Sequence, residues 1–316
     1  MTGNSYILRL TMRLSLGLSS MDNAKRDLHA QWILSKQQPD GGFPGREGPS
    51  DLYYTSFGLR ALAILGRLDQ PTAEKASAYL KSQLGGQATI VDFYSLLYSV
   101  ILIQLAGATN PLGNAHLDWE NRIVELLATL RTPDGGFAQQ PNAKAGSTYQ
   151  TFLSLLAHEI MARPVAQSES LVSFVMSRQR EDGGFVEVAP ARRGGTNPTA
   201  AAVGILKQVS EQSLSGDFRE RIIDFLVEAT GSEGGLRAND RVPLCDLLSS
   251  FTGIWTLAEL GALDAIDLKA LSAFLDAVEE PGGGFLAGVW DQTADVEYTF
   301  YGLGLRALAN NNAPPI

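Results

Sequence analysis

Asp182-Gly183-Gly184-Phe185 is one copy of a short step that recurs along the chain. Successive copies lie about 44 to 51 residues apart, which is the spacing of a repeated helix pair. Six copies predict six repeat units. The same four letters stand at 40–43 and 134–137, and variants stand at 84–87, 233–236 and 283–285.

An amphipathic stretch precedes the diglycine, as in Ser168 through Gln179, where apolar residues recur at helical spacing. Glycine accepts the left-handed conformation that ends such a helix, and the Phe or Leu that follows then reaches the core. About eight to twelve residues later a second helix begins, at a residue whose side chain caps its free N–H groups. We expect these starts at Asp51, Asp92, Ser147, Asp246 and Asp295.

The second helices contain more apolar and small residues than the first ones, as in Val203-Gly204-Ile205-Leu206. A helix that is apolar on all sides is buried on all sides. We therefore predict an all-α fold, an (α/α)6 toroid (barrel) of six helix-pair repeats with apolar inner and amphipathic outer helices. We expect residues 23–310 to form this single domain, residues 1–22 to hold an N-terminal helix packed on the toroid, and residues 311–316 to form a frayed tail.

The composition of the chain excludes several classes of protein. A formal net charge of −9 and a pI near 4.9 repel phosphate backbones, so nucleic acid is excluded as a general partner. The single cysteine, Cys245, excludes an internal disulfide and a cysteine-rich zinc module. Arginines interrupt the apolar run at 5–16, which predicts neither a signal peptide nor a membrane span. We expect a cytoplasmic protein without a transmembrane segment.

The diglycine turns and the helix starts behind them resemble the β subunits of protein prenyltransferases, which share their toroid with squalene and other terpenoid cyclases. The resemblance extends from about Asn23 to Ala309, and is clearest where the turn at 42–48 leads to the helix start at 51–55. It implies a transferase of isoprenyl groups that holds an isoprenoid, as the isoprenyl diphosphate, in a central aromatic cavity. It also implies a partner subunit, because the family's β subunits pair with a helical-repeat α subunit; a homodimer is the alternative.

The resemblance implies zinc as the cofactor, but the zinc ligands of the family are not retained. The family holds zinc with an Asp and a Cys two residues apart in the fifth repeat and a His at the start of the sixth inner helix. Alignment of the fifth turn places Cys245 and Leu247 at the first two positions, and a shift by one places Asp246 and Leu248 there. Tyr298 stands where the His belongs. We therefore predict no metal site and no other cofactor.

Arginines near the fourth and fifth turns are candidates for diphosphate binding. The family uses an Arg and a Lys after the fifth turn, and the matching positions here are Asn239 and Val242. Arg193, Arg237 and Arg241 lie close by in sequence, and the planar guanidinium fork suits phosphate oxygens. We predict that these three arginines bind the substrate's diphosphate; the alternative is that they are solvated loop charges.

Carboxylates and aromatic residues gather at the expected starts of the inner helices. The carboxylates have two interpretations. They cap free N–H groups, or, because all starts face one mouth of the ring, two of them act as an acid and a base or jointly bind a cation. Aromatic faces suit isoprenoid chains and carbocations, although aromatic residues also fill cores. The predicted catalytic residues are Asp246, Asp295, Asp51 and Tyr298, and the predicted substrate-binding aromatic residues are Tyr54, Tyr94, Tyr149 and Trp255.

Three further functions stay open. A class II terpenoid cyclase protonates an alkene with an Asp-x-Asp-Asp motif, which this sequence lacks, so the cyclase alternative is a metal-free homologue. A ring that has lost its metal also serves as a non-catalytic scaffold that binds an isoprenoid or a protein. Glycosidases of this shape need two carboxylates set for acid and base work, and the aspartates at the helix starts leave that function open.

Overall fold

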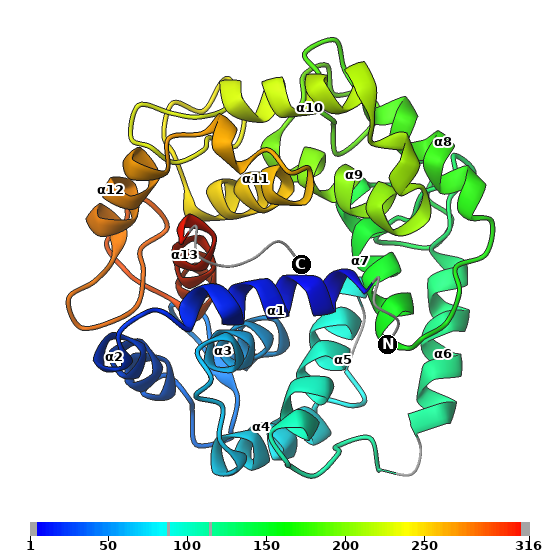
Figure 1. Cartoon of the computed structure of the whole chain (residues 1–316). Coiled ribbons are helices and arrows are strands. Elements are labelled where there is room, and N and C mark those ends of the chain that lie inside the picture. The colour runs from blue at the N-terminus through cyan, green and yellow to red at the C-terminus, as the bar shows by residue number, and fades with distance from the viewer. Residues whose placement is uncertain (1–4, 87–88, 114–115, 311–316) are drawn as a thin grey trace. The chain divides into compact units, whose positions relative to one another are not determined.

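The computed structural model describes residues 5–86, 89–113 and 116–310 (Figure 1). Within these residues α1 (Tyr6–Leu18) precedes twelve helices that form six consecutive pairs, and β1 (Phe43–Pro44) pairs antiparallel with β2 (Ser50–Asp51). The even-numbered helices are α2 (Asn23–Leu34), α4 (Gln70–Ser82), α6 (His116–Thr129), α8 (Ser168–Arg178), α10 (Gly216–Glu228) and α12 (Leu268–Val278). The odd-numbered helices are α3 (Leu52–Ile64), α5 (Ile90–Leu105), α7 (Thr148–Ile160), α9 (Thr196–Val209), α11 (Leu247–Glu259) and α13 (Val296–Ala309). Short 3-10 turns lie at Glu211–Ser213 and Leu263–Ala265.

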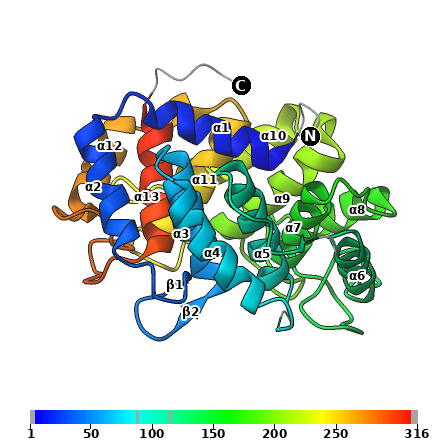
Figure 2. The same ribbon diagram turned by 90° about the horizontal axis from the view of Figure 1, so that it is seen from below.

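The chain divides into two compact units. The first unit combines residues 1–9 with 124–274, and the second combines 10–123 with 275–316. In the first unit α9 packs between α7 and α11; in the second α3 packs between α13 and α5, and Figure 2 shows α3 and α13 side by side. The odd-numbered helices are therefore neighbours within each unit, and they bury most of their residues, as predicted for the apolar set. The boundaries at 22 and 310 stay a prediction, and residues 311–316 lie outside the described residues.

Side-chain caps define the starts of most odd-numbered helices. The prediction for Asp92 is wrong: Thr89 is the N-cap of α5, and Asp92 lies within its first turn, where the carboxylate accepts a hydrogen bond from the Thr89 N–H at 3.1 Å. This capping box satisfies two N–H groups at once. Thr and Asp are both good N-cap residues, so the sequence pattern alone placed the start of the helix at Asp92, which is too late. The four other predicted caps accept hydrogen bonds from the first backbone N–H groups: Asp51, Ser147, Asp246 and Asp295.

Each intact diglycine packs its turn against the next even-numbered helix. Gly183 has φ of 87°, and a Cβ there would lie 2.3 Å from the carbonyl oxygen of Arg221 in α10. A Cβ at Gly184 would lie 2.5 Å from the ring of Phe225 in the same helix. Any side chain is therefore excluded by the backbone conformation at the first position and by the close approach at both. The variant at 84–87, which we call the worn copy, does not pack in this way, since nothing lies within 4 Å of a Cβ at Gly85.

The last diglycine docks on α2, the first of the even-numbered helices. A Cβ at Gly284 would lie 2.6 Å from the ring of Trp32. The Gly284 N–H donates to Nδ1 of His29 at 3.1 Å, so the ring proton of His29 is on Nε2, which faces Oε1 of Glu279 at 3.1 Å. His29 is buried completely and stacks on Phe285, so its role is structural.

A hydroxyl group in the first turns of an odd-numbered helix holds the turn that precedes it. Oγ1 of Thr199 accepts a hydrogen bond from the Phe185 N–H at 2.9 Å and donates to the carbonyl of Gly195 at 2.7 Å. With its N–H group satisfied, Phe185 enters the core and has no exposed surface. The corresponding hydroxyls in the other intact copies belong to Thr55, Thr151, Ser250 and Thr299.

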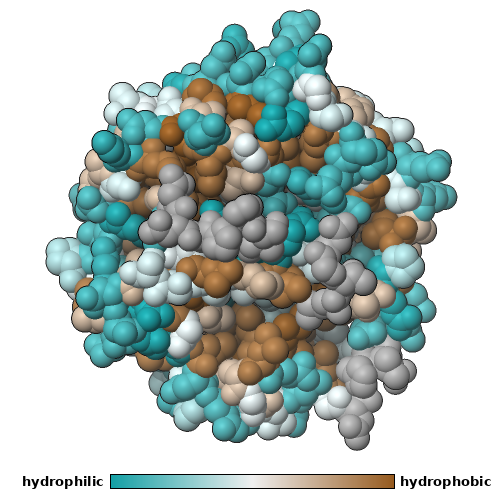
Figure 3. Space-filling model, viewed as in Figure 1, coloured by the Kyte–Doolittle hydropathy of each residue, from teal (hydrophilic) through white to brown (hydrophobic). Residues whose placement is uncertain are grey.

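The first helix is shared between the units, because residues up to Arg9 belong to the first unit and those from Leu10 to the second. In the second unit Thr11 forms a hydrogen bond with the hydroxyl of Tyr98 at 2.7 Å. Met12 and Leu16 are the exposed large apolar residues of α1. Figure 3 shows hydrophobic residues at the surface on the side of the molecule where α1 lies. None of the described helices combines the length and the apolar character needed to cross a membrane.

Replacement of Thr199 by Val keeps the shape of the side chain but leaves the buried Phe185 N–H without its acceptor. We expect the free energy of unfolding to fall by about 1–3 kcal/mol, measured by urea denaturation. Thr129→Val is the matched control, because the Thr129 hydroxyl is exposed and bonds only to the Leu126 carbonyl of its own helix. Its expected change is below about 0.5 kcal/mol, and equal losses in the two variants would contradict the anchoring role.

Gly183→Ala tests the docking of the diglycine turn. The left-handed backbone and the contact with the Arg221 carbonyl both oppose a Cβ, so we expect a loss of about 2 kcal/mol or more in the free energy of unfolding. Gly85→Ala in the worn copy is the control and should change the free energy by less than about 0.5 kcal/mol. Comparable urea midpoints for Gly183→Ala and the wild type would show that the turn tolerates a side chain.

Candidate functional site

The starts of α3 and α13 lie together in the second unit, and both predicted carboxylates there cap their helices. Asp51 accepts hydrogen bonds from the N–H groups of Tyr53 at 2.7 Å and Tyr54 at 3.3 Å. Asp295 accepts one from the Tyr298 N–H at 2.9 Å. The capping interpretation is thus confirmed for both residues, and their catalytic role stays a prediction.

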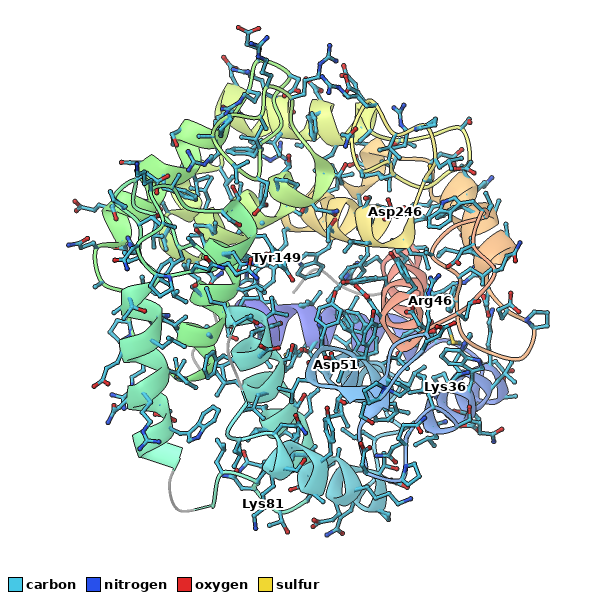
Figure 4. The ribbon with its side chains drawn as sticks, turned by 180° about the vertical axis from the view of Figure 1, so that it is seen from behind. Lys36, Arg46, Asp51, Lys81, Tyr149 and Asp246 are labelled. Carbon is cyan, nitrogen blue, oxygen red and sulfur yellow. The ribbon has the colours of Figure 1, made fainter. Side chains whose placement is uncertain are left out.

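Arg46, in the turn before α3, joins this turn to the start of α13. Its Nε donates to Oδ2 of Asp295 at 2.9 Å, and its terminal nitrogens donate to Asp291 at 2.8 and 2.5 Å. Figure 4 shows Arg46 and Asp51 beside one another. Burial opposes the charge on Arg46, but the two carboxylates raise the pKa of the guanidinium above its ordinary value. Sequence analysis missed Arg46, because an arginine in a polar turn reads as a solvated charge.

Two of the predicted tyrosines lie against this ion pair. The guanidinium of Arg46 lies over the ring of Tyr298, 5.7 Å from its centroid. A Cβ at Gly45 would touch the ring of Tyr54 at 2.7 Å, so Tyr54 packs against the same turn. Partial burial and then the charges of Glu297, Asp295 and Asp51 raise the pKa of the Tyr54 hydroxyl. The structure therefore brings four predicted residues to one place: Asp51, Asp295, Tyr54 and Tyr298.

A cluster of aromatic rings continues from these helix starts into the second unit. We call it the aromatic cluster. The Tyr53 ring lies 4.9 Å from Phe57, and Phe57 lies 5.5 Å from Phe300 and 5.3 Å from Tyr301, all edge to face. Tyr94, a predicted substrate-binding residue, is buried and lies 5.8 Å from Tyr98. The cluster comprises Tyr53, Tyr54, Phe57, Tyr94, Tyr98, Tyr298, Phe300 and Tyr301.

Glu297 is a carboxyl group inside the aromatic cluster, with 8% of its surface exposed. Its Oε1 accepts hydrogen bonds from the hydroxyls of Tyr53 at 2.5 Å and Tyr301 at 3.3 Å. Burial is the largest influence on its pKa and raises it, and the nearby charge of Asp295 adds to the increase against the opposing hydrogen bond from Tyr53. Glu297 was not predicted from the sequence, although a carboxylate in the first turn of a mostly apolar helix is a signal that could have identified it.

The first unit holds the remaining predicted residues. Asp246 caps α11, accepting hydrogen bonds from the N–H of Ser249 at 2.7 Å and from its hydroxyl at 2.8 Å, and burial raises the pKa of this carboxyl group. Nε1 of Trp255 donates to the hydroxyl of Tyr6 in α1 at 2.8 Å. Tyr149 is 39% exposed at the start of α7. The substrate roles of Trp255 and Tyr149 stay predictions.

The three predicted arginines do not form one site in the first unit. Arg193 and Arg237 line a pocket of about 900 Å³ beside the end of α10, and Arg241 is not among its lining residues. Arg237 donates to the carbonyls of Glu228 at 2.7 Å and Ala229 at 3.3 Å. Arg193 pairs with Asp240. Arg237 is thus occupied in holding its loop to the end of α10, and the diphosphate role of the three arginines stays a prediction.

The residues at the family's zinc positions do not fit a zinc ion. Cys245 is fully buried, and burial followed by its hydrogen bond with Glu233 raises the pKa of the thiol to about 11, so it does not present a thiolate at neutral pH. Leu247 has no donor atom, and Tyr298 packs beneath Arg46. Among the described residues no three His, Cys, Asp or Glu side chains are grouped so that they could hold a metal. No step of the chemistry below runs through zinc.

Comparison with known proteins agrees with this architecture. Residues 6–187 and 199–313 match the family described as the prenyltransferase alpha-alpha toroid domain, which confirms the predicted fold class. The β subunit of geranylgeranyl transferase type 2 from Saccharomyces cerevisiae is 24% identical over 268 residues, which cover 82% of each chain.

Solved structures with the same fold belong to more than one class of enzyme. The protein geranylgeranyltransferase-I of Candida albicans, complexed with GGPP, has a TM-score of 0.67 at 13% identity, over 91% of this chain and 92% of that chain. An alpha-1,6-mannanase from Salegentibacter sp. has a TM-score of 0.60 at 11% identity, over 90% of this chain and 98% of that chain. At these identities the likeness shows the fold alone.

Glu297→Gln tests the environment of the buried carboxyl group through the pH dependence of stability. Because its pKa in the folded protein is raised, Glu297 binds its proton more tightly when folded, so its contribution to stability is present at low pH and is lost as pH rises through the folded pKa. Gln does not titrate, so we expect the stability of the variant relative to wild type to increase with pH. Chemical denaturation from pH 4 upwards measures this, with Glu181→Gln at an exposed site as the control. A difference that stays constant with pH would contradict the assignment.

Proposed function

The chain belongs to the prenyltransferase alpha-alpha toroid domain family, and from this premise we propose that it binds an isoprenoid, supplied as an isoprenyl diphosphate, as a divergent prenyltransferase-like protein. The aromatic cluster of the second unit is the observation that carries the proposal. Its edge-to-face rings lie at and behind two adjacent helix starts. Such ring faces bind the hydrocarbon of an isoprenoid and stabilise positive charge that develops on it.

The names of two similar proteins support this choice of ligand. The yeast relative is a subunit of a geranylgeranyl transferase, and the Candida enzyme is complexed with GGPP. We therefore propose a C15 or C20 isoprenyl diphosphate as the ligand. The diphosphate contacts from Arg193, Arg237 and Arg241 and the cytoplasmic location remain predictions from the sequence.

A partner is part of the same proposal. The yeast relative is the β subunit of its enzyme, and 82% of its length aligns with this chain. A second subunit or a second copy of this chain is therefore expected, as the sequence resemblance implies. Exposed apolar side chains in the turns support it, namely Val242 and Leu244 in the first unit and Val289 in the second.

A second candidate function is acid-initiated chemistry on the isoprenoid, as in a metal-free terpenoid cyclase homologue. The buried Glu297 favours it, because burial raises the pKa of this carboxyl group and so favours the protonated form that a general acid needs. In the step, the O–H bond of Glu297 breaks and a C–H bond forms at an alkene carbon, which leaves a carbocation against the rings. The hydroxyls of Tyr53 and Tyr301 hold the carboxylate that remains, and transfer of a proton from the hydrocarbon back to this carboxylate ends the reaction and restores the acid.

Thermal denaturation with farnesyl and geranylgeranyl diphosphate, each with and without zinc and magnesium, tests the proposed function. A bound ligand raises the melting temperature by linkage, so we expect an increase with at least one diphosphate that does not depend on zinc. Inorganic pyrophosphate is the control for binding through charge alone. No shift with any isoprenoid would contradict the proposal and leave the non-catalytic scaffold that binds a protein.

The same ligands distinguish the two proposed reactions, prenyl transfer and acid-initiated cyclisation. In prenyl transfer the C–O bond to the diphosphate breaks, a bond to an acceptor thiol forms and pyrophosphate is released, whereas acid-initiated cyclisation converts the hydrocarbon and leaves the diphosphate attached. Product analysis of the protein incubated with each ligand and a peptide that offers a cysteine thiol therefore distinguishes them, and Glu297→Gln should abolish only the second reaction. Binding without conversion supports the non-catalytic isoprenoid-binding scaffold.

A further inference from the structure

Arg60 is a buried cation in the middle of α3. It stands nine residues after Asp51, which is about 13 Å along the helix axis at 1.5 Å per residue. Only 8% of its surface is exposed. Long charged side chains are seldom buried so deeply unless an opposite charge or hydrogen-bond acceptors surround them, so the partners of Arg60 decide its role.

The partners of Arg60 are ring faces. Its guanidinium lies 4.1 Å from the ring centroid of Phe300, 4.7 Å from that of Phe57 and 5.0 Å from that of Tyr98. Each such contact attracts the cation through the negative face of the ring, whereas burial of the charge opposes it. The rings thus offset much of the cost of the charge, but a ring face does not accept the N–H groups at the edge of the guanidinium as a carbonyl or carboxylate does.

The N–H groups of Arg60 have no acceptor among the described residues. Nε is buried without a hydrogen-bond partner, the two terminal nitrogens donate to no described residue, and no described carboxylate forms an ion pair with the side chain. A guanidinium carries five N–H donors; in Arg60 the Nε–H is buried, and the terminal N–H groups have no protein acceptor among the described residues. Unpaired buried donors favour any ligand that brings an acceptor to them.

The polar groups that face Arg60 are already engaged with one another. They come from three helices: Tyr53 of α3, Tyr94 and Tyr98 of α5, and Glu297 and Tyr301 of α13. Glu297 accepts from Tyr53 and Tyr301, and the Tyr98 hydroxyl is bonded to Thr11. Burial opposes the charge on Arg60, but the tyrosine oxygens raise its pKa, so the guanidinium stays charged and its donors stay available.

We propose that Arg60 binds an oxygen acceptor on the hydrocarbon part of the ligand, so that the isoprenoid bound here carries a carboxylate or hydroxyl group at its far end. The proposal rests on the isoprenoid function proposed above and specifies the class of isoprenoid. The ring faces contact the hydrocarbon between the helix starts and Arg60, and the guanidinium edge receives the terminal oxygen. A charge-assisted pair in this largely buried setting discriminates between ligands, because a plain hydrocarbon end leaves the buried Nε–H and the terminal N–H groups without a protein or ligand acceptor.

Isothermal titration of two ligands tests the proposal: farnesyl diphosphate and its analogue with a carboxylate on the terminal carbon. We expect wild-type protein to bind the carboxylate analogue about tenfold or more tightly than the parent. In Arg60→Met the preference should disappear or reverse, because the side chain keeps its length but loses its donors. Arg60→Lys keeps the charge without the planar fork and should retain part of the preference.

Arg67→Met is the control, because Arg67 lies just past the end of α3 and pairs with Asp27 at the surface. It should keep the wild-type preference. If wild type binds both ligands equally, or if Arg60→Met keeps the preference, the inference fails while the proposed function stands. If neither ligand binds, the proposed function is contradicted, and the inference about Arg60 is contradicted as well. Should Arg60→Met not fold, the wild-type comparison and Arg60→Lys decide the question.

Discussion

The hydrogen bond between a helix hydroxyl and the N–H group of the residue after each diglycine is the constraint on which the rest of the structure depends. Thr199 with Phe185 and Thr299 with Phe285 are two instances. The bond fixes the turn to the start of the odd-numbered helix, while the diglycine fixes the same turn to the next even-numbered helix. In each intact copy one short segment thus connects the end of one helix, the start of a second and the side of a third.

The chemistry of the second unit depends on these fixed starts. Asp295 is held by its own helix and by Arg46, which sets Tyr298 and Tyr54 around one ion pair. Behind them the aromatic cluster encloses two ionisable groups, the Glu297 carboxyl and the Arg60 guanidinium, that do not form an ion pair within 4.0 Å. A protein core normally excludes such groups or pairs them directly. Glu297 and Arg60 are both buried among aromatic rings without pairing with each other, and we connect this arrangement with the binding of a ligand.

The sequence predicted the framework well, because its signals are local. A diglycine, a capping residue and an apolar stretch each act within a few residues, so the fold class and four of five predicted helix caps follow from them. The start of α5 was placed at Asp92 rather than Thr89 because a capping box contains two residues that cap equally well. The candidate site was harder to predict. Arg46, Arg60 and Glu297 are defined by what surrounds them, and those neighbours lie far along the chain.

The predicted arginines illustrate the same limit from the other side. The hydrogen bonds of the Arg237 guanidinium to backbone carbonyls at the end of α10 could not be predicted from the sequence, and its diphosphate role stays a prediction. A sequence shows the charge and the spacing of its residues. The hydrogen bonds that already engage a side chain depend on the tertiary structure.

Photo-crosslinking with a benzophenone-bearing farnesyl diphosphate, followed by peptide mapping, tests the central claim most directly, namely that the aromatic cluster is the ligand site. We expect labels within residues 52–60 and 296–301, competed by unlabelled farnesyl diphosphate. Competed labels confined to residues 180–194 and 237–240, around the arginine pocket, would contradict it.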